Sequence, residues 1–255
     1  MELTILGSGT TNPTQKRYEP GYLLKIGKDL VLLDAGTDTK MQIVKSGNND
    51  LKVNYIFISH THCDHVDGLP ALFWRWWVGK KGDILTILGP KGTKRFINKM
   101  GAAFFPKFED YFKFKIKIKE MHNSSYRTKN WKVKSMYTWR QGHTSSPYAL
   151  AYRIEHKGKT LVYGADMCYD YPKSIVQIAK NADVLLIEAA VPESKKHEDH
   201  LTPSRAGQLA AEANVNKLIL THFYFDTSKH DVKAQVKKYF KGQVVIAKDL
   251  MKIKI

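Results

Sequence analysis

Short apolar stretches recur along the chain, and polar residues or glycines separate them. Their length and their content of valine, isoleucine and leucine are typical of β-strands. We predict strands at Leu3–Leu6, Gly21–Ile26, Leu30–Leu33, Tyr55–Ile58, Ile84–Leu88, Leu150–Glu155, Thr160–Tyr163, Val184–Glu188, Leu218–Thr221 and Val244–Ala247.

Apolar positions with helical spacing lie between several of these strands. The predicted helices are Asp38–Lys45, Gly68–Trp77, Lys91–Met100, Tyr171–Asn181, Pro203–Ala213 and Asp231–Phe240. Strands cluster early and helices are interleaved, which favours sheets covered by helices over a simple parallel doubly wound fold. No internal repeat or linker rich in proline, glycine and serine divides the sequence, so we expect a single domain over residues 1–255.

The segment Tyr111–Lys119 alternates strictly between apolar residues and lysines. A period of two predicts a strand with one apolar face and one lysine face. The lysine face is either solvated, as on an edge strand that its charges protect from aggregation, or a track for an anionic ligand.

The charge of the chain is strongly positive, with 41 lysines and arginines against 24 acidic residues and a net charge of +17. Such a field attracts RNA, DNA or phosphorylated substrates. The alternative is that the protein belongs to a lysine-rich proteome, such as that of a thermophile, in which lysine simply fills surface positions.

Two cysteines, Cys63 and Cys168, are too few for a disulfide framework and predict reduced, buried thiols. The first residues show no basic region followed by an apolar stretch, and no apolar run reaches the roughly 18 residues needed to cross a membrane. We therefore expect a cytoplasmic protein without a membrane partner.

Residues 56–65 read Ile-Phe-Ile-Ser-His-Thr-His-Cys-Asp-His. A buried strand ends here, and four side chains that can bind metal follow it closely: His60, His62, Asp64 and His65. Histidines two positions apart at a strand end can project to the same side, and Asp64 lies at the start of the next helix, in a position compatible with capping. Imidazoles and carboxylates suit Zn²⁺ and related divalent ions, so the segment predicts a metal site.

This segment resembles the signature His-x-His-x-Asp-His of the metallo-β-lactamase superfamily. Other landmarks of that superfamily follow at the expected places: Asp34 in Leu33-Asp34-Ala35-Gly36, His143 in Gly142-His143-Thr144, Asp166 in Gly164-Ala165-Asp166 and His222 in Thr221-His222-Phe223. The resemblance covers nearly the whole chain. It implies an α+β fold, a four-layer αββα sandwich with metals at the seam between two sheets.

The resemblance also implies two divalent metal ions, with zinc expected and manganese or iron as alternatives. One ion would be held by His60, His62 and His143, the second by Asp64, His65 and His222, and Asp166 would bridge them. Asp34 would fix a ligand histidine through its ring N–H. The alternative for Asp34 is a structural aspartate in the turn before Gly36.

A second resemblance narrows the branch of the superfamily. The run Asp199-His200-Leu201-Thr202-Pro203 before a predicted helix is similar to the His-x-Thr motif of ribonuclease Z and related phosphodiesterases. By that match His200 would stand near the leaving group and donate a proton or steady phosphate oxygens. The alternative is a residue at a helix start beside a Thr202 cap. We take Asp64 and His200 as the candidate catalytic residues.

The sequence also departs from ribonuclease Z. Residues Pro13–Tyr18 keep the residue types of that family's N-terminal loop with a different spacing, and no long arm that clasps transfer RNA is visible. Both transfer-RNA processing and hydrolysis of small phosphodiesters therefore remain open. The helix after the metal motif carries Phe73, Trp74, Trp76 and Trp77, which we expect in the core or at a homodimer surface, with base stacking as the alternative.

We predict a dinuclear metal-dependent phosphodiesterase that hydrolyses RNA or a small phosphodiester by attack of a metal-bridging hydroxide. One alternative is a hydrolase that cleaves a thioester or lactone at the same site. The other is a nucleic-acid-binding module whose metal site is vestigial.

Overall fold

The structure, a computed structural model, describes residues 1–12, 14–82, 84–105, 112, 114–140, 148–167, 172–195 and 200–255. Of the residues that the sequence analysis singled out, His143, Cys168 and Asp199 lie outside these ranges, as do Pro13, Tyr111 and Tyr171, which begin segments named there.

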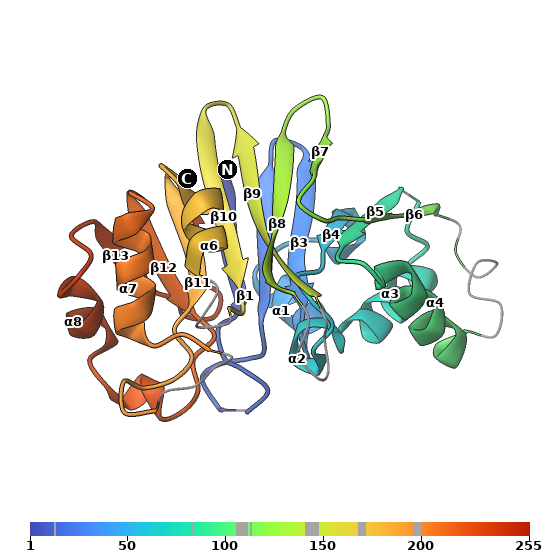
Figure 1. Cartoon of the computed structure of the whole chain (residues 1–255). Coiled ribbons are helices and arrows are strands. Elements are labelled where there is room, and N and C mark those ends of the chain that lie inside the picture. The colour runs from blue at the N-terminus through green and yellow to red at the C-terminus, as the bar shows by residue number, and fades with distance from the viewer. Residues whose placement is uncertain are drawn as a thin grey trace.

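Two β-sheets form the centre of the molecule (Figure 1). In the first, β3 to β6 are parallel, and the strands on the other side of β3 are antiparallel. Its strands, in spatial order, are β14 (Lys252–Lys254), β1 (Glu2–Gly7), β2 (Gly21–Ile26), β3 (Asp29–Ala35), β4 (Val53–Phe57), β5 (Leu85–Gly89) and β6 (Ile116–Glu120).

The second sheet has the same plan, because an antiparallel meander leads into parallel strands. Its strands, in spatial order, are β13 (Gln243–Ile246), β12 (Lys217–Thr221), β11 (Val184–Glu188), β10 (Lys159–Ala165), β9 (Tyr148–His156), β8 (Lys132–Arg140) and β7 (Ser125–Arg127). The described chain thus forms the same sheet topology twice, although no repeat was found in the sequence.

Helices cover the outer face of each sheet (Figure 1). On the first sheet lie α1 (Thr39–Lys45), α2 (Cys63–Val66), α3 (Leu69–Val78) and α4 (Thr93–Phe104), and on the second lie α6 (Pro172–Ala179), α7 (Pro203–Glu212) and α8 (Val232–Lys237). Short 3₁₀ turns are η1 (Asp50–Lys52) and η2 (Thr227–Lys229). The predicted four-layer αββα sandwich is confirmed.

The alternation of side chains along each strand divides the core into separate apolar layers. In β3, Val31 and Leu33 point between the sheets, where they join residues of the second sheet such as Tyr152 and Leu186. Leu32 points the opposite way, towards the helices over the first sheet. Both faces of the central parallel strands β3, β5 and β11 are therefore buried, which explains why these strands read as largely apolar runs.

The lysine-alternating segment forms a shorter strand than predicted. β6 begins at Ile116 instead of Tyr111 and lies at an edge of the first sheet. Phe114 precedes the strand and is buried against Trp76, which explains why the apolar period extends beyond the strand. Within β6, Ile116 and Ile118 are half-buried while Lys117 is exposed, as an edge strand with a solvated face requires.

The aromatic residues of α3 divide between core and surface. Phe73 and Trp76 are fully buried, whereas Trp74 and Trp77 keep 49% and 38% of their surface exposed. The first pair confirms the predicted core role. None of the helices within the described ranges has the length and apolar character needed to cross a membrane.

Candidate metal centre

Strand ends from both sheets bring the predicted metal ligands together. Asp34 lies near the end of β3, His60 follows β4, Asp166 follows β10 and His222 follows β12. The backbone departs from extended geometry at three of these ends, because Asp34, Ala165 and His222 have positive φ angles of 53°, 52° and 58°. The pairing register shifts beside Asp34 in β3 and beside Ala165 in β10, as at a β-bulge, and bulges change the direction in which neighbouring side chains point.

The short helix α2 supplies two further groups. It begins at Cys63, so Asp64 and His65 lie in its single turn. The residue at the N-cap position is His62, which makes no capping hydrogen bond through its side chain. The predicted capping position of Asp64 is therefore wrong by two residues. Its carboxylate instead points to His222, with 3.3 Å between Asp64 Oδ2 and His222 Nε2.

Buried nitrogen and oxygen atoms converge at the seam. Asp166 Oδ1 lies 3.3 Å from His65 Nε2 and 3.4 Å from His222 Nε2, while Asp166 Oδ2 lies 3.9 Å from His60 Nε2. Two sets of three side chains each place one ligand atom within 4.8 Å of the others. They are His60, His65 and Asp166, and Asp64, His65 and His222.

The donor set fits a divalent cation. Among the described residues, none forms a hydrogen bond with His60 Nε2, His65 Nε2 or Asp166 Oδ1, although all three atoms are buried. Ser59 Oγ donates to Asp34 Oδ2 and therefore accepts from His60 Nδ1, which leaves the lone pair of His60 on Nε2. This lone pair lies 3.9 Å from Asp166 Oδ2 and repels that carboxylate oxygen unless a cation lies between the two atoms. The centre therefore has the chemistry of a metal site.

Protonation favours the same conclusion. Burial lowers the pKa of His60 well below its ordinary value, and the neighbouring His65 lowers it further. Burial alone would raise the pKa of Asp166, but His222 and His65 hold it well below the ordinary range. A neutral imidazole and an ionised carboxylate are the forms that bind metal, so His60 and Asp166 are already in those forms. Burial alone would lower the pKa of His65, but the carboxylates of Asp166 and Asp64 raise it well above the ordinary value, so His65 must release a proton when it binds a metal ion.

Asp34 lies behind this cluster and orients it. Its Oδ2 accepts from His65 Nδ1 at 2.8 Å, and its Oδ1 accepts from the Ser59 backbone N–H at 2.7 Å. The hydroxyl of Tyr163, from the second sheet, also donates to Oδ2. The predicted contact between Asp34 and a motif histidine is confirmed, and the alternative of a purely structural aspartate in a turn is not needed.

Two further predicted metal ligands, His62 and His143, are not among the side chains that converge at the seam in the described structure. The ring of His62 lies beside the ring of His60, with 4.3 Å between centroids, but His62 belongs to neither of the two sets. His143 lies outside the described residues.

The two cysteines were predicted to be buried. Cys63 is exposed, so its predicted burial is wrong, and the predicted burial of Cys168 falls outside the described ranges.

His200 lies next to the cluster, as the sequence predicts. Its ring centroid is 5.5 Å from that of His222, and one of its ring nitrogens forms a third set with Asp166 and His222. Thr202 caps α7 by accepting from the Arg205 backbone N–H, so the predicted cap is also present. The cap and the place beside the cluster are compatible.

Glu188 is a functional candidate that the sequence analysis missed. Its Oε2 lies 2.9 Å from His200 Nδ1, and its Oε1 accepts from the Met167 backbone N–H at 2.6 Å. The carboxylate is fully buried, and burial raises its pKa against the opposing effect of His200. An acidic residue closing the apolar run Val184–Glu188 was the available signal, because the other functional carboxylates also lie at strand ends.

Comparison of the sequence with known proteins shows which families and proteins the chain is similar to. A family model described as "Beta-lactamase superfamily domain" matches residues 30–223. Ribonuclease Z from Methanocaldococcus jannaschii is 27% identical over 98% of this chain and 96% of its own length. Ribonuclease Z from Nocardia farcinica is 26% identical over 99% of this chain and 97% of its own length.

Solved structures share the fold over the same extent. The metallo-β-lactamase-fold protein YhfI from Bacillus subtilis superposes with a TM-score of 0.83 and 23% identity, covering 99% of this chain and 98% of its own. The short form of human tRNase Z gives a TM-score of 0.81 and 22% identity, covering 100% of this chain and 99% of its own.

Proposed function

Because this chain belongs to the β-lactamase superfamily, we propose that it is a metal-dependent phosphodiesterase of the ribonuclease Z type. The observation that carries the proposal is the buried convergence of His60, His65 and Asp166, whose facing atoms lack hydrogen-bond partners among the described residues. The full-length similarity to proteins named ribonuclease Z supports a phosphodiester as the bond that is cleaved.

The proposed ligands divide between two divalent ions, with zinc expected and manganese or iron as alternatives. His60, His62 and His143 would hold one ion, Asp64, His65 and His222 would hold the other, and Asp166 would contribute to both. The short distances from the two oxygens of Asp166 to three different histidines support the bridging role.

Metal ions in such a site would supply Lewis acidity, polarising the phosphate and lowering the pKa of water. The protein's own groups do the rest. Asp34 fixes His65, while Ser59 fixes the tautomer of His60, so the ligand atoms are oriented before binding. Glu188 holds Nδ1 of His200, which leaves Nε2 as the nitrogen to protonate the departing oxygen.

The deciding experiment couples metal analysis of the purified protein to hydrolysis of bis(p-nitrophenyl) phosphate and a transfer-RNA precursor. We expect Asp166→Ala to lose bound metal and turnover together, whereas Asp183→Ala, which removes a carboxylate beside Lys159 away from the centre, keeps both. Full turnover in Asp166→Ala would contradict the proposal. Hydrolysis of thioesters or lactones alone would favour the first alternative, and a salt-dependent gel shift without turnover would favour the nucleic-acid-binding module.

The domain organisation, location, substrate class and oligomeric state are also proposals. A single domain over residues 1–255 is supported by the apolar layer to which both sheets contribute. A cytoplasmic location fits the two cysteines, and RNA or a small phosphodiester fits the net charge of +17. The exposed rings of Trp74 and Trp77 are compatible with a homodimer.

A further inference from the structure

Three buried tyrosines lie between the two sheets, in the apolar layer to which both sheets contribute. Tyr22 belongs to β2 of the first sheet, whereas Tyr152 and Tyr163 belong to β9 and β10 of the second. Each side chain keeps at most 1% of its surface exposed. A phenol buried to this extent needs a hydrogen-bond partner for its hydroxyl, because an unpaired polar group in an apolar layer costs free energy.

Each of the three hydroxyls has its partner on the opposite sheet. The pairs are Tyr163 with Asp34 Oδ2, Tyr152 with the backbone carbonyl of Ile58 at 2.7 Å, and Tyr22 with Thr221 Oγ1 at 2.9 Å. Asp34 belongs to β3, Ile58 directly follows β4, and Thr221 ends β12. The hydrogen bonds therefore cross the seam and join one sheet to the other.

These partners lie beside proposed metal ligands. The partner and the ligand are Asp34 and His65, joined by a hydrogen bond of 2.8 Å, Ile58 and His60, two positions apart, and Thr221 and His222, adjacent in the chain. The tyrosines of each sheet thus hold strand ends of the other sheet close to the points from which the ligands project. Hydrogen bonds can set this alignment because they depend on direction, whereas the apolar layer around them attracts without direction.

Burial fixes both the rings and the protons of these tyrosines. The ring of Tyr22 packs on that of Tyr163, with 5.2 Å between centroids, and the ring of Tyr152 packs on that of Phe57 at the same distance. Burial raises the pKa of all three phenols well above the ordinary value, and the charge of Asp34 acts in the same direction. The hydroxyls therefore stay protonated at neutral pH, and the packing of each ring holds its hydroxyl in place.

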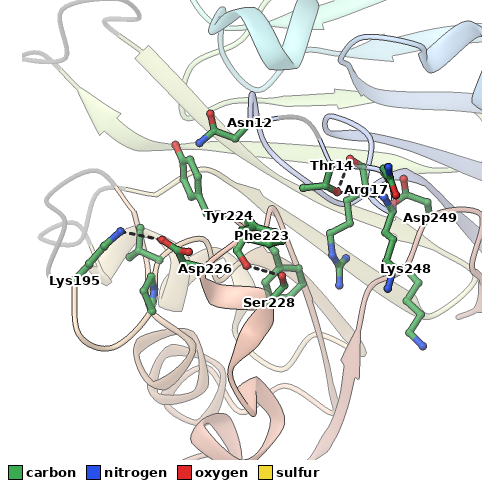
Figure 2. Close-up of a pocket in the computed structure, with 15 residues that line it drawn as sticks. Asn12, Thr14, Arg17, Lys195, Phe223, Tyr224, Asp226, Ser228, Lys248 and Asp249 are labelled. Carbon is green, nitrogen blue, oxygen red and sulfur yellow. Dashed lines mark hydrogen bonds and ion pairs between the residues drawn. The ribbon is translucent and has the colours of Figure 1, made fainter.

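A fourth connection crosses the seam on the wall of an open cavity (Figure 2). Arg17 donates to Ser8 Oγ, which follows β1, and to the carbonyl of Ala247, which follows β13, both at 2.6 Å. Its guanidinium lies 4.7 Å from the ring centroid of Phe223, the residue after His222. Arg17 is only half-buried, so water can replace part of this contact. The tyrosine hydroxyls are shielded from water, so the loss of one is not compensated in this way.

We propose that Tyr22, Tyr152 and Tyr163 are positioning residues for metal binding, which set the alignment between the ligands of the first sheet and those of the second. The inference rests on the proposed metal centre and deepens it, because it explains how ligands from two sheets are brought into one arrangement. A metal site requires ligand distances within about 0.2 Å of their preferred values. A small shift between the sheets is therefore enough to weaken binding.

The first test removes one hydroxyl and measures zinc affinity. Tyr163→Phe keeps the ring and its packing, and it should weaken zinc binding about tenfold in competition with a chromogenic chelator, the lower end of the range for groups that orient metal ligands. The control Tyr55→Phe removes a hydroxyl from the same layer, where Tyr55 packs on Tyr126 of β7 at the end of the seam away from α2 (Figure 1). Its zinc affinity should equal that of the wild type. Unchanged affinity in Tyr163→Phe overturns the inference.

The second test separates positioning from stability. Removal of a buried hydrogen bond in Tyr22→Phe, Tyr152→Phe or Tyr163→Phe also lowers the urea midpoint of the metal-free protein. A purely structural loss weakens the metal-free and metal-bound forms equally and leaves zinc affinity unchanged. We expect weaker zinc binding in these three variants and a changed visible spectrum of their cobalt(II)-loaded forms, because that spectrum reports the coordination geometry. Urea midpoints that fall while affinity and spectrum match the wild type overturn the positioning role.

Hydrolysis of bis(p-nitrophenyl) phosphate distinguishes this inference from the proposed function. Zinc binding that depends on the three hydroxyls, in a protein without phosphodiesterase activity, would refute the phosphodiesterase and leave the positioning role standing. Normal turnover by the wild type, with unchanged zinc affinity in all three variants, would do the reverse. A wild type that binds no zinc would overturn both.

Discussion

The carboxylate of Asp34 accepts hydrogen bonds from three residues, which is more than the orientation of one ligand histidine requires. From a left-handed backbone conformation it accepts from Ser59, His65 and Tyr163, and so connects both sheets to one carboxylate. Aspartate tolerates this conformation better than most residues, which explains why the position does not need glycine.

Asp34→Asn should weaken metal binding without unfolding the protein. An amide has one acceptor oxygen instead of two, so either His65 or Ser59 loses its partner. We expect a loss of about 10- to 100-fold in metal affinity, measured by competition with a chromogenic chelator. Asp29→Asn, at the other end of β3, is the matched control, because Asp29 is also buried and holds Asn54 and Trp131. Equal losses in both variants would refute a specific role for Asp34.

His200 and Glu188 should separate metal binding from turnover. We expect His200→Ala to keep its metal while kcat on bis(p-nitrophenyl) phosphate falls by about 100-fold or more. Glu188→Gln should lower kcat less and leave KM unchanged, because glutamine keeps an oxygen for the Met167 backbone N–H and changes mainly the contact that orients His200. An unchanged rate in His200→Ala would remove that residue from the mechanism, and metal loss in Glu188→Gln would make it a structural group.

At the scale of elements, sequence and structure agree where the pattern is local. The motif histidines follow a continuous apolar strand, so both the element and its functional end are visible in one stretch of chain. β8 was missed because Ser135 and Thr138 are buried polar residues and a bulge between Tyr137 and Trp139 interrupts the period of two. The partnership of Glu188 with His200 joins a strand end to a loop, and no spacing rule predicts such a contact.

Cross-strand charge pairing should be visible in the pH dependence of stability. Glu155 lies opposite Lys132 in the β8–β9 register and pairs with Lys132 at 2.6 Å and Arg153 at 2.7 Å. Burial would raise the pKa of Glu155, but these two partners lower it overall. Its stabilisation is therefore present above the ordinary carboxyl pKa and is lost as the pH falls through the lowered pKa of the folded state.

Glu155→Gln should accordingly destabilise the protein by about 0.5–1 kcal/mol at pH 7 and by much less at pH 3, as measured by urea denaturation at both values. Glu2→Gln, at a partly exposed position on β1 without an ion pair among the described residues, is the control. A difference for Glu155→Gln that grows as the pH falls would contradict the assigned sign.

At the scale of the whole molecule, metal binding should stabilise the fold. An ion present at 100 times its Kd adds about 2.7 kcal/mol, which corresponds to roughly 5–10 °C in Tm for a chain of this size. Thermal scans with and without a chelator should show this shift in the wild type and not in Asp166→Ala. A chelator-insensitive wild type that is free of metal would contradict the proposed centre.

The repeated topology distributes the proposed ligands over both sheets. His60 and His65 follow strands of the first sheet, while Asp166 and His222 follow strands of the second. During refolding, neither half could hold an ion tightly before the two have docked. The rate at which the refolding chain takes zinc from a fluorescent chelator would then report the rate at which the two halves dock. This rate should lag behind the appearance of secondary structure in each half.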